Sequence, residues 1–319
     1  MSTRQGEVTV IDDLSFEVDA SEVLGVVGES GAGKSLTGLA ILRLIDPPLF
    51  QSGGEIRFNG RRIDTLSHRD LDAMRGKDIA AVFQESMTSL NPIMTVGRQL
   101  VETILAHLPL SRRQAEERAA QLLAEVGIPA PRERLGAYPH QLSGGMRQRV
   151  VLALAFASEP RLIVADEPTT ALDVSLQAQI VSLLKAMAGE RGAAIIFITH
   201  DIGLIAQTAD RVAVLYAGRI AEIGPTADVL RSPQHPYTKG LIAAIPRMNR
   251  PLQRLFQIEG TMPGPADRPA GCAFHPRCPV AIARCPYQQP PFFLRDHSRA
   301  ACWLLEPAAA SIDGMPQNV

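Results

Sequence analysis

The chain has 319 residues, of which 46% are hydrophobic and 20% charged, a mixture typical of a globular protein and not of a disordered one. The formal net charge of −1 and the pI near 6.7 argue against a broad basic face for nucleic acid or for an anionic membrane surface. The longest apolar run, Val150 to Ala157, is far shorter than the roughly 18 residues of a membrane-spanning helix, and no stretch resembles a signal peptide. We therefore expect a cytoplasmic protein that contacts a membrane only through partners.

Short apolar or alternating stretches predict strands, and longer stretches with helical spacing separate them. The predicted strands are Val8 to Ile11, Leu14 to Val18, Val23 to Val27, Glu55 to Phe58, Ile79 to Phe83, Leu162 to Ala165 and Ala194 to Thr199. The predicted helices cover Leu36 to Leu44, two segments between Thr95 and Val126, a segment that starts just after Gly145, and Val174 to Lys185. This alternation predicts an α/β fold with a mostly parallel sheet covered on both faces, and a helical insertion between its strands.

Beyond about Arg231 the composition changes. Prolines recur throughout the remainder, and strong periodicity is limited to Thr238 to Ile245. We predict a C-terminal appendage, residues 232–319, that is held together by something other than a large apolar core.

A glycine-rich loop follows the strand at Val23 to Val27 and leads into a helix, which is the order required of a P-loop. Glycines let consecutive backbone N–H groups converge on phosphate oxygens, and the helix N-terminus adds its partial positive charge. A lysine at the end of such a loop reaches the β- and γ-phosphates, and the next hydroxyl can ligate Mg²⁺. The predicted phosphate-binding residues are Gly28, Glu29, Ser30, Gly31, Ala32, Gly33, Lys34 and Ser35.

Two adjacent carboxylates, Asp166 and Glu167, end the apolar strand at Leu162 to Ala165. Ligands of open α/β sheets lie at the carboxyl ends of the strands, so Asp166 can hold Mg²⁺ near Ser35 while Glu167 reaches an attacking water. A carboxylate pair at a strand end is common by itself, and only its combination with a P-loop makes it informative.

A second small-residue turn, Leu142-Ser143-Gly144-Gly145-Met146, also opens a predicted helix and could embrace a phosphate. Alone it is an ordinary loop, just as a lone Gln84 or His200 at a strand end is more often structural.

The combination of motifs decides the interpretation. The chain resembles the ATP-binding-cassette (ABC) ATPases over about residues 7 to 240, with the Walker A, Q-loop, signature, Walker B, D-loop and switch-histidine motifs in order. They match residues 28–35, Gln84, 142–146, 162–167, Ala171-Leu172-Asp173 and His200.

The resemblance implies a role for each of these residues. Lys34 and Ser35 would bind phosphates and Mg²⁺, Asp166 would support the metal, and Glu167 would be the general base. His200 would contact the γ-phosphate, and Gln84 would sense Mg²⁺ and the membrane partner. Because family members bind ATP between two cassettes, Ser143, Gly144 and Gly145, with Asp173, would serve the nucleotide of the partner chain.

The resemblance also implies a domain division: an ATPase domain over residues 1–231, with a helical subdomain at about 86–157, and the C-terminal region 232–319. The family's adenine-stacking aromatic residue would fall at or before Met1, and the nearest aromatic here is Phe16, on a predicted core strand. Base stacking is worth roughly 1–3 kcal/mol, so we expect weaker nucleotide binding unless the start lies further upstream.

All four cysteines lie in the C-terminal region, at Cys272, Cys278, Cys285 and Cys302. In a reducing compartment such a cluster favours a metal site over disulfides. The intervals of five, six and sixteen residues match neither the usual zinc-finger pairing nor the ferredoxin spacings.

The surrounding residues, His235-Pro236-Tyr237-Thr238 and the stretch from Pro269 to Cys278, resemble the C-terminal region of oligopeptide and dipeptide permease ATPases. Some members of that family carry a [4Fe–4S] cluster at such cysteines. The resemblance favours this cluster, with structural Zn²⁺ and free thiols or disulfides as alternatives.

The resemblance implies the ATPase subunit of a peptide-type importer at the cytoplasmic face of the membrane. Its expected partners are a second cassette of the F type, two membrane-spanning permease subunits and, indirectly, a solute-binding protein, with no nucleic acid. The methionine after Ser-Gly-Gly and the cysteine region favour the D type for this chain. Peptides, nickel complexes and glutathione are all compatible substrates.

Two functions of other classes stay open at this point. One is a soluble cassette protein that acts on nucleic acid, and the other is a redox or iron sensor that gates ATPase activity through its cysteine site. The near-neutral charge and the lack of a long coiled coil argue against the first.

Overall fold

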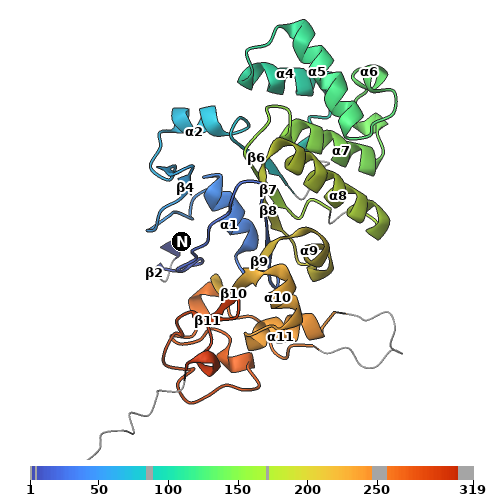
Figure 1. Cartoon of the computed structure of the whole chain (residues 1–319). Helices are drawn as coiled ribbons and strands as arrows, with labels where there is room; N and C mark the ends of the chain where they lie inside the picture. The colour runs from blue at the N-terminus through green and yellow to red at the C-terminus, as the bar shows by residue number, and fades with distance from the viewer. Residues whose placement is uncertain (1, 4–5, 84–88, 170–171, 246–256, 308–319) are drawn as a thin grey trace, which may run out of the picture.

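A single eight-stranded sheet forms the centre of the molecule (Figure 1). The computed structural model describes residues 2–3, 6–83, 89–169, 172–245 and 257–307. In spatial order the strands of the sheet are β11 (Phe293–Arg295), β12 (Ser298–Ala300), β10 (Arg219–Pro225), β9 (Arg211–Tyr216), β3 (Val23–Val27), β8 (Ala194–Ile198), β7 (Leu162–Asp166) and β6 (Ile79–Val82). Strands β6, β7, β8, β3 and β9 pair in parallel, and the remaining pairs are antiparallel.

The central strands are buried on both faces, which explains their continuous apolar sequences. Every residue of β3 and β8 is buried. Val23 and Val27 of β3 belong to one core cluster, whereas Leu24 and Val26, on the opposite face, belong to another. The structure therefore confirms the predicted α/β fold with a mostly parallel, doubly covered sheet.

Helices cover the two faces of this sheet. On one side α1 (Lys34–Ile41) packs against β7 and β8, while α8 (Val174–Arg191) packs against β8 and α9 (Ile202–Thr208) against β3. A helical layer sits at one end of the sheet, at the top of Figure 1, and comprises α4 (Val96–His107), α5 (Arg112–Glu125), α6 (Pro131–Arg134) and α7 (Gly144–Ala155). None of the helices in the described ranges is both long enough and apolar enough to cross a bilayer.

The ends of these helices follow from local sequence. Thr95 and Ser111 accept hydrogen bonds from the backbone N–H three residues later and so cap α4 and α5. Ser111 and Gln114 form a reciprocal capping box. Because α4 to α7 lie between β6 and β7 in chain order, they confirm the predicted helical insertion.

The N-terminal part contains three further short elements besides the isolated pair β1 (Ser2–Thr3) and β2 (Gly6–Glu7). These are β4 (Arg57–Phe58), β5 (Arg61–Arg62) and α2 (His68–Met74). Asn59 and Gly60 join β4 to β5 with φ of 49° and 77°, as a type I′ turn requires.

The strands predicted at Val8 to Ile11 and Leu14 to Val18 are wrong, because no residue from 8 to 18 lies in a strand. Leu14, Phe16 and Val18 are half-buried against the core, whereas Ser15 and Glu17 between them are exposed. The alternation of apolar and polar residues therefore reflects a segment that lies along the surface of the core and is not part of a sheet.

The C-terminal region extends the main sheet. After α10 (Thr226–Arg231) and α11 (Pro236–Ala243), the chain passes through the 3₁₀ turns η2 (Pro265–Asp267) and η3 (His275–Arg277) to the hairpin β11–β12, and η4 (Trp303–Leu305) follows. Strand β12 pairs with β10, which sets Ala300 opposite Glu222. The boundary at residue 231 stays a prediction, but the described part of this region shares a sheet with the rest of the chain.

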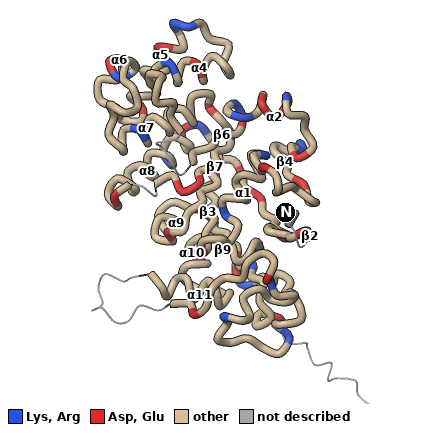
Figure 2. The backbone as a smooth tube through the Cα atoms, turned by 180° about the vertical axis from the view of Figure 1, so that it is seen from behind, with Lys and Arg blue, Asp and Glu red and all other residues tan. Residues whose placement is uncertain are grey.

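Basic and acidic residues are mixed along the described chain, as the coloured backbone in Figure 2 shows from behind. This mixture agrees with the net charge of −1.

The aromatic ring of Phe274 joins the C-terminal region to the sheet. It is only 3% exposed, and its centroid lies 5.2 Å from that of Tyr216 in β9 and 5.4 Å from that of Tyr237 in α11. We predict that Phe274→Ala lowers the free energy of unfolding by about 3–5 kcal/mol, because it leaves a cavity at this junction. Urea unfolding of the full chain measures the loss.

The matched control is Phe292→Ala, since the Phe292 side chain is 39% exposed and little packing is lost there. Equal losses for the two variants would contradict the assignment of Phe274 as the junction.

Candidate nucleotide-binding site

Three parallel strands lie side by side and bring three sequence motifs to one edge of the sheet. Strand β8 pairs with β3 on one side and with β7 on the other. The glycine-rich loop follows β3, His200 follows β8, and Glu167 follows β7. The carboxyl ends of these strands therefore define one candidate site, as ligand sites in open α/β sheets do.

The glycine-rich loop has a backbone that other residues could not adopt. A Cβ at Gly28 would lie 2.3 Å from the carbonyl oxygen of Leu215, and Gly31 and Gly33 have φ of 83° and 100°. Gly33 directly precedes α1, so the first N–H groups of this helix are open to an anion. The Lys34 ammonium donates to the carbonyls of Gly28 at 2.9 Å and Glu29 at 3.1 Å.

A hydroxyl and a carboxylate meet beside this loop. Ser35 Oγ donates to Asp166 Oδ1 at 3.1 Å. Burial lowers the pKa of Lys34 and raises the pKa of Asp166. A half-buried carboxylate and a neighbouring hydroxyl are a suitable ligand pair for Mg²⁺, whose charge would offset the cost of keeping Asp166 ionised.

Glu167 and His200 form the second polar pair of the site. His200 Nδ1 lies 3.0 Å from Glu167 Oε1, and their side chains are 61% and 16% exposed. Glu167 has φ of 46°, which is uncommon for a residue other than glycine, and its N–H donates to Ile198 O in the neighbouring strand. A non-glycine residue held in this conformation is a frequent feature of functional sites.

Some predicted residues lie elsewhere or outside the described residues. Gln84 and Ala171 fall in segments that the structure does not describe. Ser143 accepts from Met146 N–H and caps α7, which packs against α4, α5, α8 and β6 and not with α1 (Figure 1). The Asp173 carboxylate accepts from Leu176 N–H at 2.9 Å and caps α8. The Ser143–Gly145 turn is thus not brought to the glycine-rich loop of the same chain.

Two residues that sequence reasoning did not assign to the loop contact it directly. Tyr237 and Arg277, both from the C-terminal region, bind Glu29. The Glu29 carboxylate, hydrogen-bonded to the guanidinium, raises the pKa of Arg277. No local pattern could have revealed these contacts, because 208 and 248 residues separate the partners.

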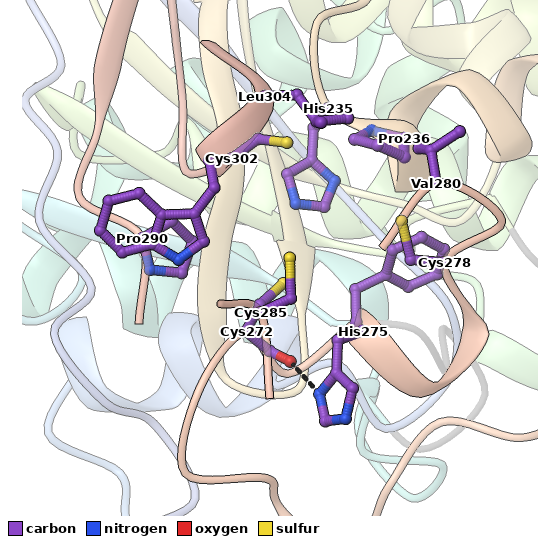
Figure 3. A pocket seen from close by; sticks show the side chains of 12 residues that line it. His235, Pro236, Cys272, His275, Cys278, Val280, Cys285, Pro290, Cys302 and Leu304 are labelled. Carbon is purple, nitrogen blue, oxygen red and sulfur yellow. Dashed lines mark hydrogen bonds between the residues drawn. The ribbon is translucent and has the colours of Figure 1, made fainter. Parts of the chain in front are cut away.

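The four cysteines line one cavity in the C-terminal region (Figure 3). Cys285 and Cys302 are buried, and Cys272 and Cys278 are half-buried. The cavity has about 10 Å³ of room for a water-sized sphere, and His235 and His275 also line it. Within the described ranges, no three His, Cys, Asp or Glu residues lie close enough to hold a metal ion.

Burial raises the pKa of the Cys278 and Cys302 thiols, and it raises the pKa of Cys272 to about 11. The nearby histidines are engaged by the backbone: His275 Nδ1 lies 2.9 Å from Cys272 O, and His235 Nδ1 accepts from Tyr237 N–H. Burial lowers the pKa of His235 to about 4, so this imidazole is neutral at pH 7. Four thiols line the cavity, and a cation among them would favour the thiolate forms.

Comparisons with known proteins agree with this site. The family model "ABC transporter" matches residues 11–170, and the model "Oligopeptide/dipeptide transporter, C-terminal region" matches residues 221–285. A solved ATP-binding cassette, MJ0796 bound to ADP and Pi in a dimeric post-hydrolysis state, is similar with a TM-score of 0.61 at 27% identity. The match covers 69% of this chain and 91% of that one. The fold and the site thus define an ABC-type P-loop ATPase.

Curated relatives narrow the family further. The chain is 46% identical to the oligopeptide transport ATP-binding protein OppD of Bacillus subtilis over 98% of its own length and 88% of the relative's. It is 44% identical to the dipeptide transport ATP-binding protein DppD of the same organism, over 97% and 92% of the two lengths. The chain belongs to the ABC transporter family, as an ATP-binding subunit of the oligopeptide/dipeptide type.

Proposed function

We propose that this ATPase powers the import of dipeptides or oligopeptides as one of two cassettes beneath two membrane-spanning subunits. The observation that carries the proposal is the meeting of the glycine-rich loop, Asp166, Glu167 and His200 at one sheet edge. Peptide transport is what the names of the two Bacillus relatives state, and it is proposed here for this chain.

In this proposal each polar residue of the site has one task. The N–H groups from Gly31 to Ser35 and the Lys34 ammonium bind the phosphates, while Ser35 and Asp166 hold Mg²⁺. Glu167 orients and deprotonates the attacking water, because it directly follows β7, one residue beyond the metal ligand. His200, paired with Glu167, contacts the γ-phosphate.

A second cassette completes the nucleotide site. The Ser143–Gly145 turn opens a helix that packs away from α1, and a Cβ at Gly144 would meet nothing within 4 Å. Such an open helix N-terminus suits the phosphates of a nucleotide held by another chain. We assign the partner to the F type of this family, with the pair at the cytoplasmic face of the membrane. Gln84 and the helical layer would then contact the membrane-spanning subunits.

The general-base assignment predicts the behaviour of a charge-neutral variant. Glu167→Gln keeps the size of the side chain but cannot accept the proton of water, so it should lower turnover at least about 100-fold while ATP still binds. Steady-state phosphate release by the assembled transporter and retention of radiolabelled ATP measure the two properties.

Glu190→Gln serves as the matched control, because Glu190 is an exposed residue near the end of α8. The control should hydrolyse ATP at the wild-type rate. Unchanged hydrolysis by Glu167→Gln in the assembled complex would remove Glu167 from the role of base.

For the cysteine cavity the same proposal includes a [4Fe–4S] cluster held by Cys272, Cys278, Cys285 and Cys302. Four thiols and no carboxylate form the donor set, which suits iron–sulfur clusters and zinc alike. When bound, the cluster would crosslink the loops around these cysteines and stabilise them.

Metal and sulfide analysis after anaerobic purification tests this assignment. We predict about four iron and four acid-labile sulfide per chain. Cys278→Ser should lower both contents and the unfolding temperature. Stoichiometric zinc without sulfide would favour the structural Zn²⁺ site instead, and the absence of both elements would leave free thiols or disulfides.

A further inference from the structure

Glu29, the second residue of the glycine-rich loop, has all of its polar groups bound. Its N–H donates to the Tyr237 hydroxyl at 2.9 Å. Its carbonyl accepts from Lys34 Nζ at 3.1 Å and from Ala32 N–H at 3.1 Å. Its carboxylate receives two hydrogen bonds from the Arg277 guanidinium, of 2.7 and 3.0 Å. The first part of the loop is therefore fixed by the C-terminal region as well as by its own lysine.

The C-terminal region in turn fixes Arg277. The Arg277 side chain is only 6% exposed. Its Nε donates to Glu259 O at 2.9 Å, and Nη1 lies 3.3 Å from the Tyr216 hydroxyl. A guanidinium that is held on several sides loses little further freedom when it binds a carboxylate with both arms.

The pair also has an electrostatic effect on the loop. The loop and the N-terminus of α1 attract anions, whereas a carboxylate two residues before Gly31 repels them. The Glu29 side chain is 28% exposed, so solvent screens its charge only in part. Arg277 neutralises this carboxylate where the phosphates of ATP would arrive.

We propose that Arg277 is a positioning residue of the nucleotide site, which holds Glu29 in place and cancels its charge, so that ATP affinity depends on the C-terminal region. The inference rests on the proposed role of residues 28–35 in ATP binding. It also joins the two candidate sites of the chain, because Arg277 contacts the loop while the next residue, Cys278, lines the cysteine cavity.

The test is the affinity of the full-length protein for Mg²⁺ and a fluorescent ATP analogue. Arg277→Gln leaves the Glu29 carboxylate unpaired and should weaken binding about tenfold, with kcat of the assembled transporter little changed. The double variant Glu29→Gln/Arg277→Gln removes the repelling charge as well and should recover most of the affinity. A merely structural role of Arg277 predicts no such recovery.

Arg284→Gln is a closely matched control. Arg284 also directly precedes a cysteine and binds a glutamate with two hydrogen bonds, of 3.0 and 2.8 Å, but its partner is Glu306 and not the loop. This variant should bind the nucleotide with wild-type affinity. If Arg277→Gln fails to fold, Arg277→Lys replaces it. The lysine ammonium keeps the positive charge but cannot form the two parallel hydrogen bonds of a guanidinium, so this variant should weaken nucleotide binding less than tenfold.

Two results would overturn the inference: wild-type affinity in Arg277→Gln, or a double variant that is folded and binds as weakly as Arg277→Gln. The proposed function fails in a different way, namely when the wild-type chain does not bind the analogue or when Lys34→Ala binds it equally well. The two failures are therefore distinguishable in one set of measurements.

Discussion

The parallel pairing of β3, β8 and β7 is the constraint on which the candidate site depends. Asp166 is the last residue of β7, and the shared direction of the three strands brings it to the same edge as the loop after β3, Glu167 and His200. The complete burial of β3 and β8 fixes the register, because a shift by one residue would exchange the side chains of the two core clusters. The distances of 3.1 Å between Ser35 and Asp166 and 3.0 Å between His200 and Glu167 follow from this framework.

The C-terminal region takes part in the same framework. It adds a hairpin to the sheet through β12 and β10, places Phe274 against Tyr216 and Tyr237, and reaches the glycine-rich loop with Arg277. The two family models match separate stretches, residues 11–170 and 221–285, yet the structure connects them by direct contacts at Glu29. In this chain the surroundings of the glycine-rich loop are therefore built in part by a second, proline-rich segment.

The sequence predicted those features that depend on local spacing. The buried strands, the loop from Gly28 to Ser35 and the helical insertion followed from periodicity and glycine placement, and the structure confirms them. Contacts between distant segments were not predictable: nothing near Glu29 indicates Arg277, and nothing near β10 indicates that Ser298–Ala300 pairs with it. The alternation at residues 8–18 was misleading because it reflects partial burial against the core, which a segment outside the strands can also show. The four cysteines were predicted to gather, and they line one cavity, but their spacing does not identify a metal.

A structure of the protein with Mg²⁺ and a non-hydrolysable ATP analogue tests the central claim most directly. The account predicts β- and γ-phosphates within hydrogen-bond distance of the N–H groups from Gly31 to Ser35, Mg²⁺ on Ser35, and Glu29 still bound to Tyr237 and Arg277. Phosphates bound away from this loop, or a loop that releases Glu29 from both residues when the nucleotide binds, would contradict it.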